Sequence, residues 1–182
     1  MSDSQWPRYQ VFEQRREGAP HENAGSLHAP DNEIALQMAR DIFVRRPTCI
    51  DLWVAPAAMI FARSAEQLAD PAWREGAPQD STPGAYRVFA KTRHAGTHQF
   101  LGTVEAEGTL SALEQALETF SDTAALVWWI VPDSAFTETD PDDAESLFAP
   151  ANDKVYRDQA DYHTVSLMRN IRHAQAERSS EE

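Results

Sequence analysis

The sequence predicts an α+β fold of two tandem ββαβ repeats, which form a pseudo-twofold dimer of antiparallel sheets with helices on one face. The first observation behind this prediction is an internal repeat. At one constant offset the following pairs match: Tyr9 and Tyr86, Val11 and Val88, Phe12 and Phe89, His21 and His98, Gly25 and Gly102, Asn32 and Thr109, Leu36 and Leu113, Ala39 and Ala116, Phe43 and Phe120. The offset slips by one residue before Trp53 and Trp129. Two copies are too few for a solenoid, but they suit a pair in which each covers the other.

The second observation is the hydrophobic periodicity of copy one. Strands are expected over residues 9–14, 23–28 and 50–54, and the first two predict a hairpin with a long loop. Asp and Asn in Pro30–Glu33 predict the start of a helix, and Pro47 ends it. A stripe at spacing i, i+3, i+4, i+7 predicts its buried face: Ala35, Met38, Ala39, Ile42. The following segment to Phe61 is expected to be irregular.

Copy two repeats this order. Strands are expected over residues 86–92, 99–105 and 125–131. A helix is expected to start at Gly108-Thr109, with Leu110, Leu113, Leu117 and Phe120 on one face. The last strand is apolar on both alternating sets, which predicts a central position covered on both sides.

These patterns divide the chain into four parts. Repeat 1 is expected to span residues 1–68 and repeat 2 residues 84–137. The Pro-, Gly- and charge-rich residues 69–83 form a linker that is long for a turn. Residues 138–182 hold an acidic solvated loop, Glu138–Glu145, and a C-terminal docking tail.

Composition limits the classes of partner. The chain has 182 residues, 42% of them apolar, and a formal charge of −13. Because nucleic acids and anionic membranes attract Lys and Arg, the acidic chain is expected to bind neither. The lone Cys49 permits no disulfide within the chain, and no apolar run reaches membrane-spanning length. The N-terminus lacks the features of a signal peptide, so we expect a cytoplasmic protein.

No catalytic or cofactor motif is recognisable, and we expect no cofactor, no bound metal and no enzymatic activity. Gly25-Ser26-Leu27-His28 lies in a predicted strand, which is the wrong setting for a serine nucleophile. His21 and His98 fall in predicted hairpin loops, where we interpret them as solvated side chains that sheet geometry holds apart. Trp53 and Trp129 are expected in the sheet core, and Cys49 is expected to be inert.

A partner interface is the remaining candidate site. Trp6 precedes the first strand and has no counterpart in copy two. The tail combines aromatic and basic residues without clear periodicity, so it either packs over the repeats or docks onto a partner. The candidate interface residues are Trp6, Tyr9, Phe148, Lys154, Tyr156, Arg157 and Tyr162.

Several motifs resemble one known family in order along the chain. They are Trp6-Pro7-x-Tyr9-x-Val11-Phe12, Ala24–Ala29, Ala35-Leu36-x-x-Ala39-Arg40-Asp41 with Arg45-Arg46, Leu52-Trp53-Val54, Phe148-Ala149-Pro150-Ala151 and Lys154-Val155-Tyr156-Arg157. Together they resemble the small, non-catalytic member of phenylacetyl-CoA epoxidase, the multicomponent monooxygenase of phenylacetate degradation. Family members are usually one copy followed by the tail, so here a second copy stands between the two. Ala69-Asp70-Pro71-Ala72 resembles a remnant of the tail of copy one.

The resemblance implies a role without chemistry of its own. In the family, a catalytic subunit carries the diiron centre, a structural subunit pairs with it, and a reductase supplies electrons. The small member connects the catalytic–structural pairs. We therefore expect a non-catalytic bridging subunit whose partners are the catalytic and structural subunits and, beyond them, the reductase. The alternative is a free-standing module that binds acyl-CoA or another small molecule, since fold alone does not decide function.

Overall fold

The computed structural model describes residues 6–45, 48–74, 82–154 and 168. Met1–Asn152 form one compact unit, and Asp153–Glu182 form a second. Tyr156, Arg157 and Tyr162 lie outside the described residues. Within the described ranges, no helix combines the length and apolar character needed to cross a bilayer.

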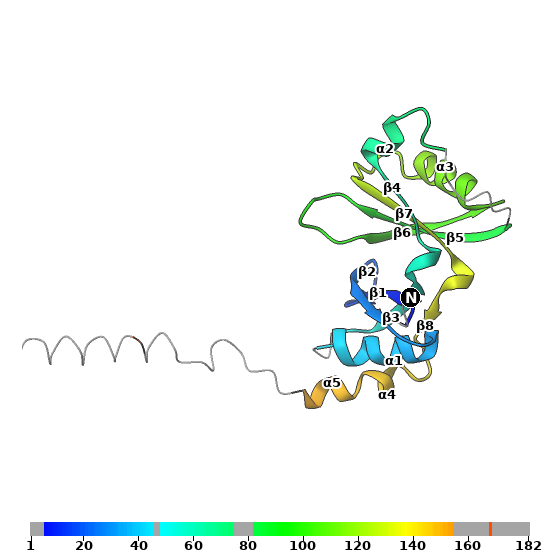
Figure 1. Ribbon diagram of the computed structural model, residues 1–182. Helices are drawn as coiled ribbons and strands as arrows, with labels where there is room; N and C mark the ends of the chain where they lie inside the picture. Colours follow the sequence, from blue (N-terminus) through cyan, green and yellow to red (C-terminus); the bar gives the residue numbers. More distant parts are fainter. Residues whose placement is uncertain (1–5, 46–47, 75–81, 155–167, 169–182) are drawn as a thin grey trace, which may run out of the picture. The chain divides into compact units, whose positions relative to one another are not determined.

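Copy one folds in the order that the periodicity predicts (Figure 1). Its elements are β1 (Arg8–Gln14), β2 (Glu22–His28), α1 (Asn32–Phe43) and β3 (Asp51–Pro56). The central β1 pairs antiparallel with both β2 and β3. Asp31 caps α1, because its carboxylate accepts the Ile34 N–H at 2.8 Å.

The buried face of α1 is narrower than the apolar stripe predicts. Ala35 and Ala39 are fully buried, and Met38 packs partly against the same core. Ile42 is 43% exposed, so the expectation that it lies on the buried face is wrong. Ile42 belongs to the last turn of the helix, where Phe43 supplies the apolar contact to the core instead.

Copy two has the same order of elements. They are β5 (Gly84–Lys91), β6 (Gln99–Ala106), α3 (Thr109–Thr119) and β7 (Val127–Pro132). β5 is central and pairs with β6 and β7. The register shifts between Val11 and Phe12 in copy one and between Val88 and Phe89 in copy two, so even the bulge is repeated.

Each copy continues into elements that the sequence patterns missed. After β3 comes the 3₁₀ turn η1 (Ala57–Met59), within the segment to Phe61 that was expected to be irregular. β4 (Phe61–Ser64) and α2 (Ala65–Ala69) follow, where no element was predicted. After β7 come η2 (Asp133–Ala135), β8 (Thr137–Glu138), α4 (Ala144–Phe148) and α5 (Pro150–Asp153). The expectation of a solvated acidic loop over 138–145 is therefore wrong at both ends, because Glu138 belongs to β8 and Ala144 begins α4.

The fourth strand of each copy pairs with the other copy. Among the described residues, eight strands form one sheet in the order β4-β7-β5-β6-β2-β1-β3-β8. β4, which follows copy one, pairs with β7 from Phe61 opposite Ile130 to Ser64 opposite Val127. β8, which follows copy two, pairs with β3. This exchange confirms the predicted α+β class of two antiparallel repeats, and it places β7 between two neighbours as its apolar pattern predicts.

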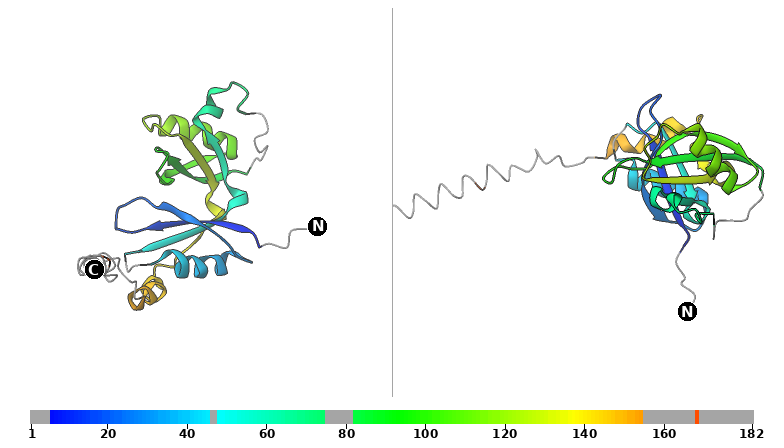
Figure 2. Two further views of the ribbon diagram at one scale, coloured as in Figure 1. Left: turned by 60° about the vertical axis from the view of Figure 1, so that its left-hand side comes forward. Right: turned by 90° about the horizontal axis from the view of Figure 1, so that it is seen from above.

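In the part of the chain that the structure describes, three apolar clusters hold these layers together. One lies between α1 and the sheet of copy one, and one lies between α3 and the sheet of copy two. The third joins the two half-sheets through residues of both copies, including Phe12, Trp53, Phe89 and Val131. Figures 1 and 2 show the result: α1 and α3 cover the outer sides, and the half-sheets lie between them.

The repeated glycines are explained by the helix that packs on each hairpin. Gly25 has φ +144, and a Cβ there would lie 2.7 Å from Cε1 of Phe43, near the end of α1. Gly102 has φ +153, and its Cβ would lie 3.0 Å from Cζ of Phe120. Only glycine leaves room for these rings at this backbone conformation. Gly25-Ser26-Leu27-His28 is therefore part of β2, an ordinary strand as predicted, in which Gly25 and Leu27 pack while Ser26 and His28 are exposed.

Candidate functional site

The junction between the copies is an aromatic core. The rings of Phe12 and Phe89, which are repeat-equivalent, lie with centroids 4.4 Å apart. Phe136 contacts both rings, at 5.8 and 6.0 Å, and the edge of Trp53 at 5.9 Å. Phe12 and Phe89 are fully buried. This geometry makes the two copies one folding unit, because separating them would expose these large aromatic side chains.

A buried arginine breaks the symmetry of this junction. Arg87 on β5 stacks over Trp53 at 4.1 Å and over Phe136 at 4.4 Å. Its Nε donates to Asp133 at 2.6 Å, and its second terminal nitrogen donates to Glu138 on β8. The guanidinium thereby connects β5 of copy two to Trp53 of copy one and to β8, the strand that pairs with copy one. The equivalent position in copy one is Gln10, which has no guanidinium, so copy one cannot make the same contacts.

The two repeated histidines lie where the half-sheets meet. The Phe100 N–H donates to the His21 carbonyl at 2.8 Å, and the Asn23 N–H donates to the His98 carbonyl at 2.8 Å. His21 stacks on Trp53 with centroids 3.3 Å apart, and His98 stacks on Trp129 at 3.5 Å. The expectation of solvated loop histidines held apart is therefore wrong. β2 and β6 pair directly, at Glu22 and Gln99, and this pairing brings the histidines to the seam.

The two histidines differ in their polar partners. His21 Nε2 lies 3.0 Å from Oδ2 of Asp51, which also accepts the Trp53 indole N–H at 2.9 Å. The position of Asp51 is Val127 in copy two. His98 Nε2 is accordingly buried without a hydrogen-bond partner among the described residues. Burial, with a smaller contribution from Lys91, lowers the pKa of His98 to about 4, so the ring is neutral at pH 7.

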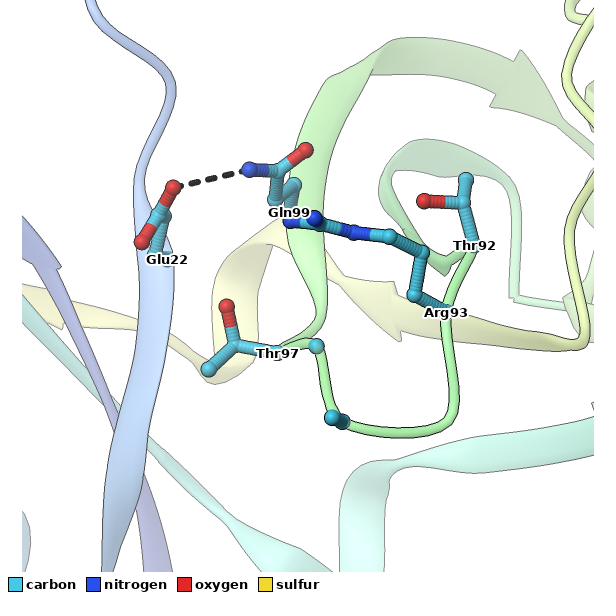
Figure 3. A pocket seen from close by; sticks show the side chains of 7 residues that line it. Glu22, Thr92, Arg93, Thr97 and Gln99 are labelled. Atoms are coloured by element: carbon cyan, nitrogen blue, oxygen red, sulfur yellow. Dashed lines mark hydrogen bonds between the residues drawn. The ribbon is translucent and has the colours of Figure 1, made fainter.

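A polar cavity of about 230 Å³ adjoins this seam (Figure 3). Glu22 of β2 and Gln99 of β6 face one another across it, and the Gln99 amide donates to Glu22 at 2.7 Å. The remaining labelled walls come from the β5–β6 hairpin: Thr92, Arg93 and Thr97. Because Glu22 and Gln99 already bond across the seam, we interpret the cavity as part of the joint between the copies rather than as a binding pocket.

No described cluster has the composition of a metal or nucleophilic site. Among residues 6–45, 48–74, 82–154 and 168, no three His, Cys, Asp or Glu side chains converge. Burial, followed by the nearby Glu13 carboxylate, raises the pKa of the Cys49 thiol to about 12. The thiolate, which is the reactive form, is therefore scarce at neutral pH.

The predicted interface residues are distributed between surface and core. Trp6 is 55% exposed, and Lys154 is partly exposed. Tyr9 is 4% exposed in the core beneath α1, and Phe148 on α4 is 9% exposed in the same core. The described start of the tail therefore covers copy one, with Phe148 turned inward.

The sequence reasoning overlooked Arg87, although a signal was present. Alternate residues of a strand share one face, so Arg87 lies on the same side of β5 as Phe89. A cation on a face that must be buried indicates an ion pair or an aromatic partner. The histidine seam offered a weaker signal, namely that His21 and His98 repeat together with Trp53 and Trp129.

The fold and its junction define a fused pseudo-dimer of two small α+β repeats. The chain matches the family described as Phenylacetic acid degradation B over residues 5–75 and again over residues 84–169. The two matched segments span most of the chain, including both copies, and the chain therefore belongs to this family.

A curated relative agrees with this assignment. It is the B component of the 1,2-phenylacetyl-CoA epoxidase of Escherichia coli (strain K12), and it is 42% identical over 67 residues. The matched region covers 37% of this chain and 70% of the relative, so the relative is about half as long. No solved structure matches.

Proposed function

We propose that the chain is a non-catalytic bridging subunit of a phenylacetyl-CoA epoxidase. The observation that carries the proposal is the family match over both copies, together with the name of the relative from Escherichia coli. The partners are the catalytic diiron subunit and the structural subunit, with the reductase acting on the assembled complex.

The use of polar side chains supports a structural role. Several groups of the kind that often perform chemistry are engaged in packing. His21 and His98 stack on tryptophans at the seam, and Arg87 lies between two aromatic rings. Cys49 is buried with a raised pKa. These four side chains serve the fold, and a chain whose role is structural acts through its surface.

The duplication fits a bridging role. The relative is about half as long as this chain, and here two copies exchange edge strands within one polypeptide. Fusion fixes the two copies at a one-to-one ratio and lowers the entropic cost of bringing them together. The fused chain can also differentiate its two faces, which two identical subunits cannot do.

Co-elution tests the proposal directly. The full chain, the catalytic subunit and the structural subunit of the same organism are purified separately, mixed and separated by size exclusion with light scattering. The proposal predicts a complex containing all three proteins. A chain that elutes alone at micromolar concentrations, but binds coenzyme A thioesters in calorimetry, would instead be the free-standing acyl-CoA module.

A further inference from the structure

The outer side of α1 exposes a line of large apolar side chains. Ile34 and Ile42 are 37% and 43% exposed, and the partly buried Met38 lies between them. The spacing i, i+4, i+8 places all three along one side of the helix. Isoleucines normally face a core, so two exposed isoleucines on either side of a partly buried methionine indicate a contact surface.

Copy two provides an internal control, because the same positions are polar there. At the constant repeat offset, Ile34, Met38 and Ile42 correspond to Ser111, Gln115 and Thr119 on α3. Both helices cover the outer side of their half-sheet (Figure 1). Copy one also carries α4 and α5, whose Phe148 and Ala151 share the core of Ala35 and Ala39, and Met38 packs partly against that core. The exposed Ile34 and Ile42 are not required for α1 to cover its sheet, since α3 covers an equivalent sheet with polar residues at these positions.

The side chains near the C-terminal end of this helix also differ between the copies, in their charge. Arg45 follows α1 and lines a cavity of about 260 Å³ together with Arg15. Arg15 is paired with Glu13, and its side chain is 63% exposed. The equivalents of Arg45 and Arg15 in copy two are Asp122 and Thr92. Copy one thus presents an apolar line that ends at the exposed Arg45, beside the ion pair of Arg15 with Glu13, on a chain whose formal charge is −13.

We propose that Ile34, Met38, Ile42 and Arg45, here termed the α1 face, dock an amphipathic acidic helix of a partner epoxidase subunit. The helix lays its apolar side chains on the line, and its carboxylates meet Arg45 and the neighbouring Arg15. The face of α3 docks nothing of this kind, so each chain takes up one such helix, through copy one. The inference rests on the proposed bridging function and adds to it the face and the chemistry of the contact.

The complementarity argues against other occupants. An acidic segment is attracted to Arg45 and would be repelled by Asp122, which gives the two copies opposite preferences. A nucleic acid is disfavoured by the net charge, since one or two arginines cannot offset it. An interface with an apolar centre and a charged rim is the usual arrangement for a specific protein contact.

The test exchanges the residues of copy one for those of copy two. The triple variant Ile34→Ser, Met38→Gln, Ile42→Thr is made in the full chain, and Arg45→Asp is made separately. The control changes the equivalent positions of α3: Ser111→Ala, Gln115→Ala, Thr119→Ala. Binding to the purified catalytic–structural pair is measured by biolayer interferometry at about 0.1 M and 0.5 M salt, with thermal unfolding and sedimentation of each variant.

We expect the triple variant to lose at least about 30-fold in affinity and Arg45→Asp at least about 10-fold, while the α3 control stays within about twofold. Wild-type binding should weaken at high salt, and the binding of Arg45→Asp should weaken less. Arg45→Asp should melt within about 2 °C of the wild type, because Arg45 is exposed and exposed substitutions change stability little. The triple variant should melt no more than about 5 °C earlier, because Ile34 and Ile42 are exposed and Met38 packs only partly against the core.

Other outcomes overturn the inference. If the triple variant binds as tightly as the wild type, the docking face lies elsewhere while the bridging function stands. If it melts more than about 5 °C earlier, the line is covered within this chain. If the wild type sediments as a dimer that the triple variant abolishes, a second copy occupies the face. If the wild type itself does not bind the pair, the proposed function fails first.

Discussion

Replacing His98 with phenylalanine should make the protein less sensitive to acid. The pKa of His98 is about 4 in the folded chain, below its ordinary value of 6.5, because the ring is buried against Trp129. At pH 5 the unfolded chain therefore binds a proton at this site and the folded chain does not. The linkage relation gives about 2 kcal/mol of lost stability between pH 7 and pH 5. Partial exposure of the ring reduces this to between about 1 and 2 kcal/mol.

The direction of the effect follows from the sign of the pKa difference. The pKa of His98 is lower in the folded chain than in the unfolded chain. The contribution of His98 to the free energy of unfolding is therefore fully present above pH 6.5 and is lost as the pH falls towards 4. His98→Phe keeps a flat ring for stacking but cannot bind a proton. Other titrating groups contribute equally to both proteins, so the difference between them isolates His98.

Urea unfolding of wild type and His98→Phe at pH 7 and pH 5 measures this quantity. The variant should lose about 1 to 2 kcal/mol less than the wild type on acidification. A matched variant, Val127→Asp, supplies the carboxylate that Asp51 provides for His21, and it should also reduce the acid sensitivity by favouring the protonated ring. Equal losses in wild type and His98→Phe would refute the buried, neutral assignment.

Three further predictions concern the packing of the two copies, each measured by chemical denaturation at pH 7. Phe89→Ala should lower the free energy of unfolding by about 3–5 kcal/mol, because it leaves a cavity beside Phe12 at the fully buried junction. A loss below about 1 kcal/mol would show that the junction is loosely packed. Gly25→Ala should cost about 1–3 kcal/mol, and more than Gly18→Ala, because both have positive φ but only Gly25 meets a ring; equal costs would contradict the steric argument. Arg87→Gln introduces the residue found in copy one and should lower the free energy of unfolding by about 1–2 kcal/mol. An unchanged midpoint of denaturation would mean that the contacts of Arg87 with Trp53 and Asp133 do not stabilise the fold.

The repeat made the elements predictable because burial recurs with it. Tyr86 and Val88 are buried as Tyr9 and Val11 are, so the central strands of the two copies match. The start of α1 was readable from capping chemistry, since Asp31 accepts the N–H that the first turn leaves free. Capping and periodicity depend only on residues that are close in sequence, so they can be recognised without knowing the tertiary structure.

The exchanged strands were not predictable by the same means. β4 has four residues and β8 has two, too few for a period to be recognised. Their positions depend on which edge lies nearest after the copies have packed, and that is a property of the whole fold. The acidic composition around Glu138 favoured a loop, but its carboxylate is needed at the edge of β3 to meet Arg87.

The partner interface stays a prediction, and the structure removes two of its residues from the surface. Trp6 is exposed, whereas Tyr9 and Phe148 are turned into the core of copy one. Aromatic residues suit an interface and a core equally well, so residue type alone does not separate the two. A comparison of the two copies separates the two roles better. Ile34 and Ser111 occupy equivalent positions of one fold, so folding alone does not explain why one is apolar and the other polar.

Epoxidase turnover reconstituted from separately purified subunits tests the central claim most directly. Phenylacetyl-CoA consumption is followed with the catalytic subunit, the structural subunit and the reductase, while the chain is titrated from zero to excess. The account predicts that turnover depends on the chain and saturates once the chain is stoichiometric with its partners, and that the chain alone gives no product. Full turnover in its absence, or product formed by the chain alone, would contradict a non-catalytic bridging role.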